Sequence, residues 1–222
     1  MKKIFLLLPV LVYASSYGQL QNTTAPTDVF MHYRVSSKNG KQLSYEEVKG
    51  SPYLVKDFRS AKIADGYEMV LARYNAYTDE VEFKKGDGVY VLPKNKDFSQ
   101  INFLNSKDNL ILISNGDDSS GYYFKITGDK NSLLKKEKVV FNDVVPSASS
   151  YESEKPAKFL SQKPIYYFKT DKGVVKKILN NNDIYDLFPD KKQSVNKFIK
   201  EKRIKINQEN DLIELVNYLN SI

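Results

Sequence analysis

Apolar and polar residues alternate in short stretches through the middle of the chain, and this period of two is typical of half-buried β-strands. The clearest case is residues 122–127, where every second residue is aromatic or aliphatic. Clusters of turn-forming residues at 86–88, 115–121 and 171–173 separate the stretches and predict hairpins. The predicted strands are 29–35, 58–63, 67–77, 81–83, 89–92, 101–104, 110–113, 122–127, 139–141, 165–170 and 174–179.

The apolar spacing changes to three and four residues near the C-terminus, which predicts two amphipathic helices. Asp190, with Gln193 three residues later, is the predicted N-cap of the first helix, and Asn207 is that of the second. Residues 195–199 and 212–219 supply the two apolar faces.

Many short strands followed by segregated helices indicate an α+β fold. The expected architecture is an antiparallel β-rich sandwich, roll or open barrel followed by a C-terminal pair of helices. We predict a single exported domain over residues 19–222, β-rich in 19–180 and helical in 181–222. Residues 142–163, rich in Ser and Pro, are predicted to be a long polar connection.

Residues 1–18 have the features of a signal peptide. Lys2 and Lys3 precede an apolar run over residues 4–12, and Ser16 and Gly18 fit the small-residue positions of a cleavage site. The run is shorter than the roughly 20 residues that a membrane anchor needs, so export is favoured. We expect the protein in the periplasm, with secretion into the medium as the alternative, and no transmembrane span after signal cleavage.

Composition removes several kinds of chemistry. The 222 residues include no Cys and one His, which excludes disulfides, thiolate sites, a lipid-bearing Cys and His-rich metal sites. His32, near Asp28, is interpreted as an ordinary strand residue. No nucleophile elbow, P-loop or dinucleotide fingerprint occurs in the sequence. We therefore predict no catalytic residue, metal or cofactor, and an enzyme is the less favoured interpretation.

Positive charge is concentrated late in the chain. Residues 163–205 hold 12 basic and 5 acidic residues. Such a face would suit anionic lipid headgroups, lipopolysaccharide or an acidic partner, while a solvated lysine-rich helix face is the alternative. Nucleic acid is not predicted, since the chain has the marks of export and contains only four Arg. The candidate binding residues are Lys176, Lys177, Lys197, Lys200 and Arg203.

Tyrosine is abundant, with 16 residues, and tyrosines are enriched at interfaces as well as in strands. Where two are adjacent, as at 122–123 and 166–167, alternation predicts that one of each pair faces outward. The candidate binding tyrosines are Tyr74, Tyr77, Tyr123 and Tyr167.

Two acidic segments are candidate chemical sites. Glu80 and Glu82, next to Asp79, would lie about 7 Å apart on one strand face. That face is predicted to be the solvated one, and cross-strand pairing with a lysine is the simpler interpretation than acid–base chemistry. Residues 115–120 could offer oxygen ligands to calcium, but the spacing fails the EF-hand pattern and favours a hairpin loop.

The segments 71–83, preceded by 50–54, and 188–192, followed by 198–200 and 211–215, together resemble a group of uncharacterised exported proteins of Bacteroidota. The resemblance covers most of the chain after the signal. It implies an envelope location and one shared architecture, and it carries no catalytic residue.

The leading hypothesis is a non-enzymatic periplasmic or cell-envelope interaction or accessory protein. The first alternative is a periplasmic binding module for a lipid or glycan ligand. The second is a hydrolase that uses Asp79, Glu80 or Glu82. The expected partner is an envelope protein, a lipid or a glycan, and the oligomeric state is left open.

Overall fold

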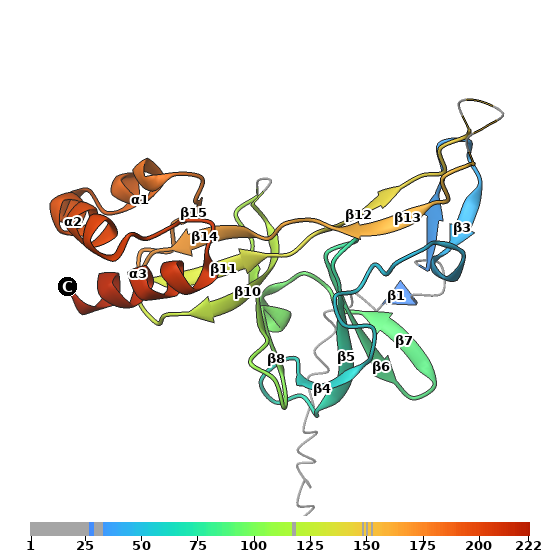
Figure 1. The fold of residues 1–222 in the computed structure, drawn as a ribbon. Helices are drawn as coiled ribbons and strands as arrows, with labels where there is room; N and C mark the ends of the chain where they lie inside the picture. Colours follow the sequence, from blue (N-terminus) through green and yellow to red (C-terminus); the bar gives the residue numbers. More distant parts are fainter. Residues whose placement is uncertain (1–26, 29–32, 117–118, 148, 150, 152) are drawn as a thin grey trace, which may run out of the picture.

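A computed structural model describes residues 27–28, 33–116, 119–147, 149, 151 and 153–222. It is dominated by one antiparallel sheet of eleven strands, with helices at the C-terminal end (Figure 1). The strand order is β1-β7-β6-β5-β4-β8-β9-β10-β11-β14-β15. The strands are β1 Thr27–Asp28, β4 Arg59–Lys62, β5 Val70–Asn75, β6 Glu80–Lys85, β7 Gly88–Val91, β8 Gln100–Phe103, β9 Asn109–Ile113, β10 Gly121–Thr127, β11 Ser132–Lys136, β14 Ile165–Lys169 and β15 Val175–Lys177.

Two smaller hairpins accompany the main sheet. Strands β2 (Arg34–Ser36) and β3 (Gln42–Ser44) form one, and β12 (Val139–Asn142) and β13 (Lys158–Ser161) form the other. The second hairpin continues the direction of β11 and β14, so the two pairs resemble one long ribbon in Figure 1. Short 3-10 helices lie at Tyr45–Glu47, Lys96–Phe98 and Pro189–Lys191.

The main sheet is rolled. Tyr74 on β5 and Phe124 on β10 are separated by three strands in the sheet order, yet their ring centroids are 5.7 Å apart. The backbone N–H of Val139 donates to the carbonyl of Ala76, just after β5, at 3.1 Å. Because β5 thus approaches the later strands across the roll, the predicted β-rich roll or open barrel in an α+β fold is confirmed.

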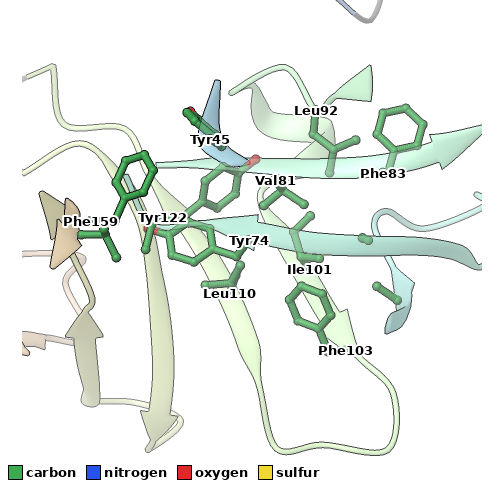
Figure 2. Close-up of a cluster of buried hydrophobic side chains, with 14 of the residues drawn as sticks. Tyr45, Tyr74, Val81, Phe83, Leu92, Ile101, Phe103, Leu110, Tyr122 and Phe159 are labelled. Carbon is green, nitrogen blue, oxygen red and sulfur yellow. The ribbon is translucent and has the colours of Figure 1, made fainter. Parts of the chain in front are cut away.

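The first hydrophobic core fills this roll (Figure 2). Val81, Ile101 and Leu110 are fully buried between its strands. Tyr45 and Phe159 extend the core toward the smaller hairpins, with ring centroids 5.2 Å apart. The small hairpins are therefore packed onto the rolled sheet through aromatic contacts.

The second core lies between the sheet and three helices, α1 (Asn181–Leu187), α2 (Lys192–Lys202) and α3 (Glu209–Ser221). Leu133 and Phe168 face it from β11 and β14. Asn220 ties the end of α3 to the β10–β11 turn, since its Oδ1 accepts from the backbone N–H of Asn131 at 2.9 Å and its Nδ2 donates back to the Asn131 carbonyl. The helices are thereby fixed on one face of the sheet.

The helical region differs from prediction in three details. Helix α1 was not expected, and it begins at an Asn180 N-cap whose side chain accepts from the N–H of Asn182. Asp190 lies inside a 3-10 turn and α2 is preceded by Lys191, so Asp190 is not the N-cap. Helix α3 is preceded by Gln208, one residue after the predicted Asn207.

The predicted polar connection at 142–163 is also partly wrong. Residues 158–161 form β13, whose pairing with β12 and backbone bonds with Lys49 supply partners that a polar sequence does not reveal. The predicted strand at 139–141 belongs to β12, and residues 137–138 separate it from β11, which was not predicted. Of the strand predicted at 29–35, residues 29–32 lie outside the described residues.

Leu215 tests whether α3 stabilises the second core. It is fully buried, as are its neighbours Leu212 and Val216. Leu215→Ala removes apolar contacts and leaves a cavity, so we expect the free energy of unfolding to fall by about 3 kcal/mol. Urea denaturation followed by circular dichroism measures it, and Glu214→Ala on the exposed side of the helix is the control. A loss below about 1 kcal/mol would show that α3 is an appendage.

Candidate functional site

The predicted binding tyrosines are mostly part of the cores. Tyr74 is 5% exposed and Tyr123 1% exposed, and Tyr77 packs half-buried against Tyr45 and Phe159. The expectation that one residue of the pair 122–123 faces outward is wrong, since Tyr122 is also 1% exposed. Both faces of β10 are covered at this point, so simple alternation fails.

Tyr123, Tyr167 and Lys177 come together on the sheet face away from the helices. The rings of Tyr123 and Tyr167 meet edge to face, with centroids 5.0 Å apart, and Lys177 lies opposite Tyr167 in the β14–β15 register. Lys136 places its ammonium 4.7 Å from the Tyr123 ring centroid. Of this group Lys177 is exposed and Tyr167 half-buried.

The predicted basic residues separate into two places. Lys176 on β15 forms ion pairs with Asp186 at 2.8 Å and Asp183 at 3.6 Å, so it joins the sheet edge to α1. Lys197 and Lys200 are exposed on α2, and Arg203 follows that helix as its C-cap. The nine predicted residues therefore do not form one site.

Glu82 is buried, and this corrects the prediction that its strand face is solvated. Its side chain is 1% exposed, and its carboxylate accepts from Arg73 Nε at 2.7 Å, Tyr53 Oη at 3.0 Å, Asn75 Nδ2 at 3.2 Å and Tyr33 Oη at 3.4 Å. The strand face is buried because side chains from outside the strand cover it. Sequence reasoning could not locate them, since Tyr33 lies 49 residues away.

The Glu82 network has the character of a structural ion pair. The Arg73 guanidinium also donates to the Lys56 carbonyl and lies 3.8 Å from the centroid of the Tyr53 ring. Burial, and then the negative charge of Glu82, raise the pKa of Tyr53, and the same causes raise the pKa of Tyr33. These phenols stay protonated and keep donating to the carboxylate, which is consequently covered from any substrate.

A second carboxylate, that of Asp79, joins four segments. Its Oδ1 accepts from Tyr74 Oη at 2.7 Å and Lys136 Nζ at 2.8 Å, and its Oδ2 accepts from Lys94 Nζ at 3.0 Å. The backbone N–H of Tyr122 also donates to it, at 3.2 Å. The turn between β5 and β6 is thus bound to β10, β11 and the loop after β7.

Local backbone geometry makes the Asp79 contacts possible. Asp79 has a φ of 59°, in the left-handed region that aspartate tolerates better than most residues. Gly121 approaches so closely that a Cβ there would overlap the Asp79 carboxylate. Burial lowers the pKa of Lys136, although the nearby Asp79 opposes the shift. Both oxygens of the Asp79 carboxylate are thus engaged by donors from the fold itself.

An open cleft of about 420 Å³ lies where the two cores meet, beside α3. We call it the α3 cleft. Phe124 and Ile126 of β10 and Ile213 of α3 contribute apolar surface, and Tyr74 also lines it. Leu54 and Val55 add side chains that are 38% and 40% exposed. Of the predicted binding residues, Tyr74 is the one that lines this cleft.

Ion pairs lie on opposite sides of β10 at the α3 cleft. On the β4 side, Arg59 Nη1 contacts Asp108 Oδ2 at 2.6 Å. On the β11 side, Lys135 Nζ contacts Glu209 of α3 at 3.0 Å and Glu137 at 3.5 Å. Burial opposes the charge of Lys135, but hydrogen bonding and attraction to Glu209 and Glu137 outweigh it and raise its pKa. The cleft therefore combines an apolar centre with charges of both signs.

Sequence reasoning missed most of the α3 cleft. Its apolar residues come from segments more than 150 positions apart, such as Leu54 and Ile213. No local pattern marks them, because each also fits an ordinary strand, turn or helix. Only the rolled sheet brings them together.

Other sequence-level candidates gain no support. His32 and the central residues of the acidic loop, Asp117 and Asp118, lie outside the described residues. Within the described ranges, no group of three or more His, Cys, Asp or Glu side chains is arranged to hold a metal ion. No helix in the described part of the chain has the length and apolar character needed to cross a membrane.

In comparisons with known proteins, neither a family model, nor a curated protein, nor a solved structure matches this chain.

Asp79→Asn tests the stabilising role of the Asp79 cluster, since Asn keeps the left-handed turn and removes the charge. We expect the free energy of unfolding to fall by about 2 kcal/mol, less than a fully buried pair would lose, because Asp79 is 22% exposed. Lys94→Ala is the matched control and should cost less than about 1 kcal/mol, since Lys94 is 40% exposed. Equal losses in urea denaturation would contradict the assignment.

The buried tyrosines predict loss of stability at alkaline pH. Burial raises the pKa of Tyr45 to about 12, whereas the ordinary value is 10.0. Because the folded-state pKa is the higher one, this stabilisation is complete below pH 10 and declines as the pH rises toward 12. Urea midpoints measured from pH 8 to 11.5 should fall, and should fall less steeply in Tyr45→Phe. Parallel curves for the two proteins would refute this.

Proposed function

We propose that the protein is an exported, non-enzymatic interaction protein of the cell envelope, in which the α3 cleft receives an apolar segment of a partner protein. The observation that carries this proposal is the set of partly exposed apolar side chains in the cleft, above all Leu54 and Val55. The signal-like N-terminus supports export, with the periplasm favoured over the medium.

The size and lining of the α3 cleft suit a polypeptide segment. Its volume of about 420 Å³ lies in the range of binding pockets, enough for one or two side chains. The ion pairs Arg59–Asp108 and Lys135–Glu209 border the apolar centre. A peptide that covers these ion pairs can form hydrogen bonds and salt bridges with them, whereas an acyl chain would bury them without such partners.

The hydrogen bonding of two carboxylates supports an interaction role over hydrolysis. Glu82 and Asp79 each accept hydrogen bonds from several side chains. A general acid or base has to come within hydrogen-bond reach of the substrate. Both carboxylates are instead engaged in holding the fold together.

A photoreactive residue in the α3 cleft tests the proposal. p-Benzoylphenylalanine at Val55 should cross-link one discrete protein in cells that make this chain naturally. The same residue at Met69, which is 67% exposed and does not line the cleft, is the control. Cross-links of equal yield at both positions would contradict the proposal. An adduct with the mass of a lipid or glycan would favour a lipid- or glycan-binding module instead.

Charge placed in the apolar part should abolish the contact. We expect Leu54→Asp combined with Val55→Asp to lower partner affinity at least about tenfold, because two buried apolar contacts become desolvated charges. Both residues are partly exposed, so the fold should persist. Met69→Asp is the control. Because Val55 is replaced in the double variant, the photoreactive residue is placed there at Ile126, which also lines the cleft. Unchanged cross-linking from Ile126 would overturn the assignment of the cleft.

A further inference from the structure

Helix α2 lies at one end of the molecule (Figure 1). The helix and the turn after it are strongly basic. The stretch from Lys191 to Lys205 contains seven basic residues and one acidic residue, Glu201. The apolar residues Val195 and Ile199 are buried in the second core. The charged side chains consequently lie on the outside, and six of the seven basic residues are exposed.

Few of these cations are neutralised within the protein. Lys197 approaches Glu201 at 3.8 Å and Lys202 approaches Glu214 of α3 at 3.3 Å, both between well-exposed side chains. Such surface pairs contribute little and exchange readily with solvent. Four further cations have no carboxylate within 4 Å among the described residues: Lys192, Lys200, Arg203 and Lys205.

Arg203 has an unusual backbone conformation for its residue type. It follows α2 with a φ of 53°, the left-handed position that Gly or Asn usually occupies at a helix end. Departures from such local preferences are often found where a side chain serves a function. Here an arginine extends the row of cations beyond the helix. Before the N-terminus of the helix, Asp190 is an exposed acidic residue.

We propose that this α2 surface docks on an anionic phospholipid bilayer. Its cations are spread over the outside of a helix and a turn, and none of them lines the α3 cleft. A spread set of cations matches a plane of phosphate groups better than it matches one small anion. The half-buried rings of Phe198 and Tyr218, stacked with centroids 4.0 Å apart, lie beside it and suit the headgroup region.

The contact is peripheral and electrostatic. The apolar face of α2 is occupied by the second core, so the helix does not insert into the acyl layer. Binding should therefore weaken sharply with salt, because the Debye length falls from about 8 Å at 0.15 M to about 3 Å at 1 M. This inference is independent of the α3 cleft and of any partner protein that binds there.

Vesicle co-sedimentation tests the inference on the protein purified after export. We expect binding to vesicles of phosphatidylethanolamine and phosphatidylglycerol (3:1), and none to phosphatidylcholine vesicles. Each cation near such a surface contributes roughly fivefold in affinity. The triple variant Lys197→Gln, Lys200→Gln, Arg203→Gln should therefore bind about a hundredfold more weakly. The control Lys41→Gln, Lys85→Gln, Lys155→Gln removes the same charge from exposed lysines on other elements.

The outcomes separate the alternatives. Equal losses in the two triple variants would mean that net charge alone attracts the protein, and this would overturn the inference. Failure of the wild type to bind phosphatidylglycerol vesicles overturns it as well. If the α2 surface then binds soluble poly-glutamate, its partner is an acidic protein and not a bilayer. Matching circular dichroism and melting curves ensure that the variants are folded.

Discussion

The carboxylate of Asp79 is the contact on which the roll of the sheet depends. A sheet of many strands twists without closing unless something fixes the distance between distant strands. Asp79 provides this link, because Tyr74 from β5 and Lys136 from β11 bind the same oxygen. Position 121 has to be Gly, because the Cβ of any other residue would overlap the Asp79 carboxylate.

The charged groups of the protein divide into two kinds. Glu82 is buried and Asp79 half-buried, and each accepts from several donors, so their role is to hold segments that are distant in sequence. The cations of α2 lie outside and are largely unpaired. The α3 cleft is intermediate, with ion pairs that border an apolar centre. The carboxylates that hold the fold together are therefore different residues from those of the proposed binding surfaces.

The elements that the sequence predicted correctly are those that local periodicity determines. The alternation over 122–127 and the turn at 86–88 correspond to β10 and to the β6–β7 hairpin, and the C-terminal spacing corresponds to α2 and α3. Prediction from the sequence failed where partners come from far away. Glu82 was expected in solvent because its cover, Tyr33 and Tyr53, belongs to other segments. The α3 cleft was invisible for the same reason, and β13 was missed because its pairing compensates for a polar sequence.

The α3 cleft lies where a bound molecule would contact both hydrophobic cores. Tyr74 and Phe124, which belong to the first core, line it together with Ile126 and Ile213, which belong to the second. A molecule seated there touches both cores at once, so its binding free energy also strengthens the joint between them. Occupancy would brace the helical end against the roll and convert two adjoining units into one stiffer body. Motion of the helices relative to the sheet would then be smaller in the bound protein than in the free protein.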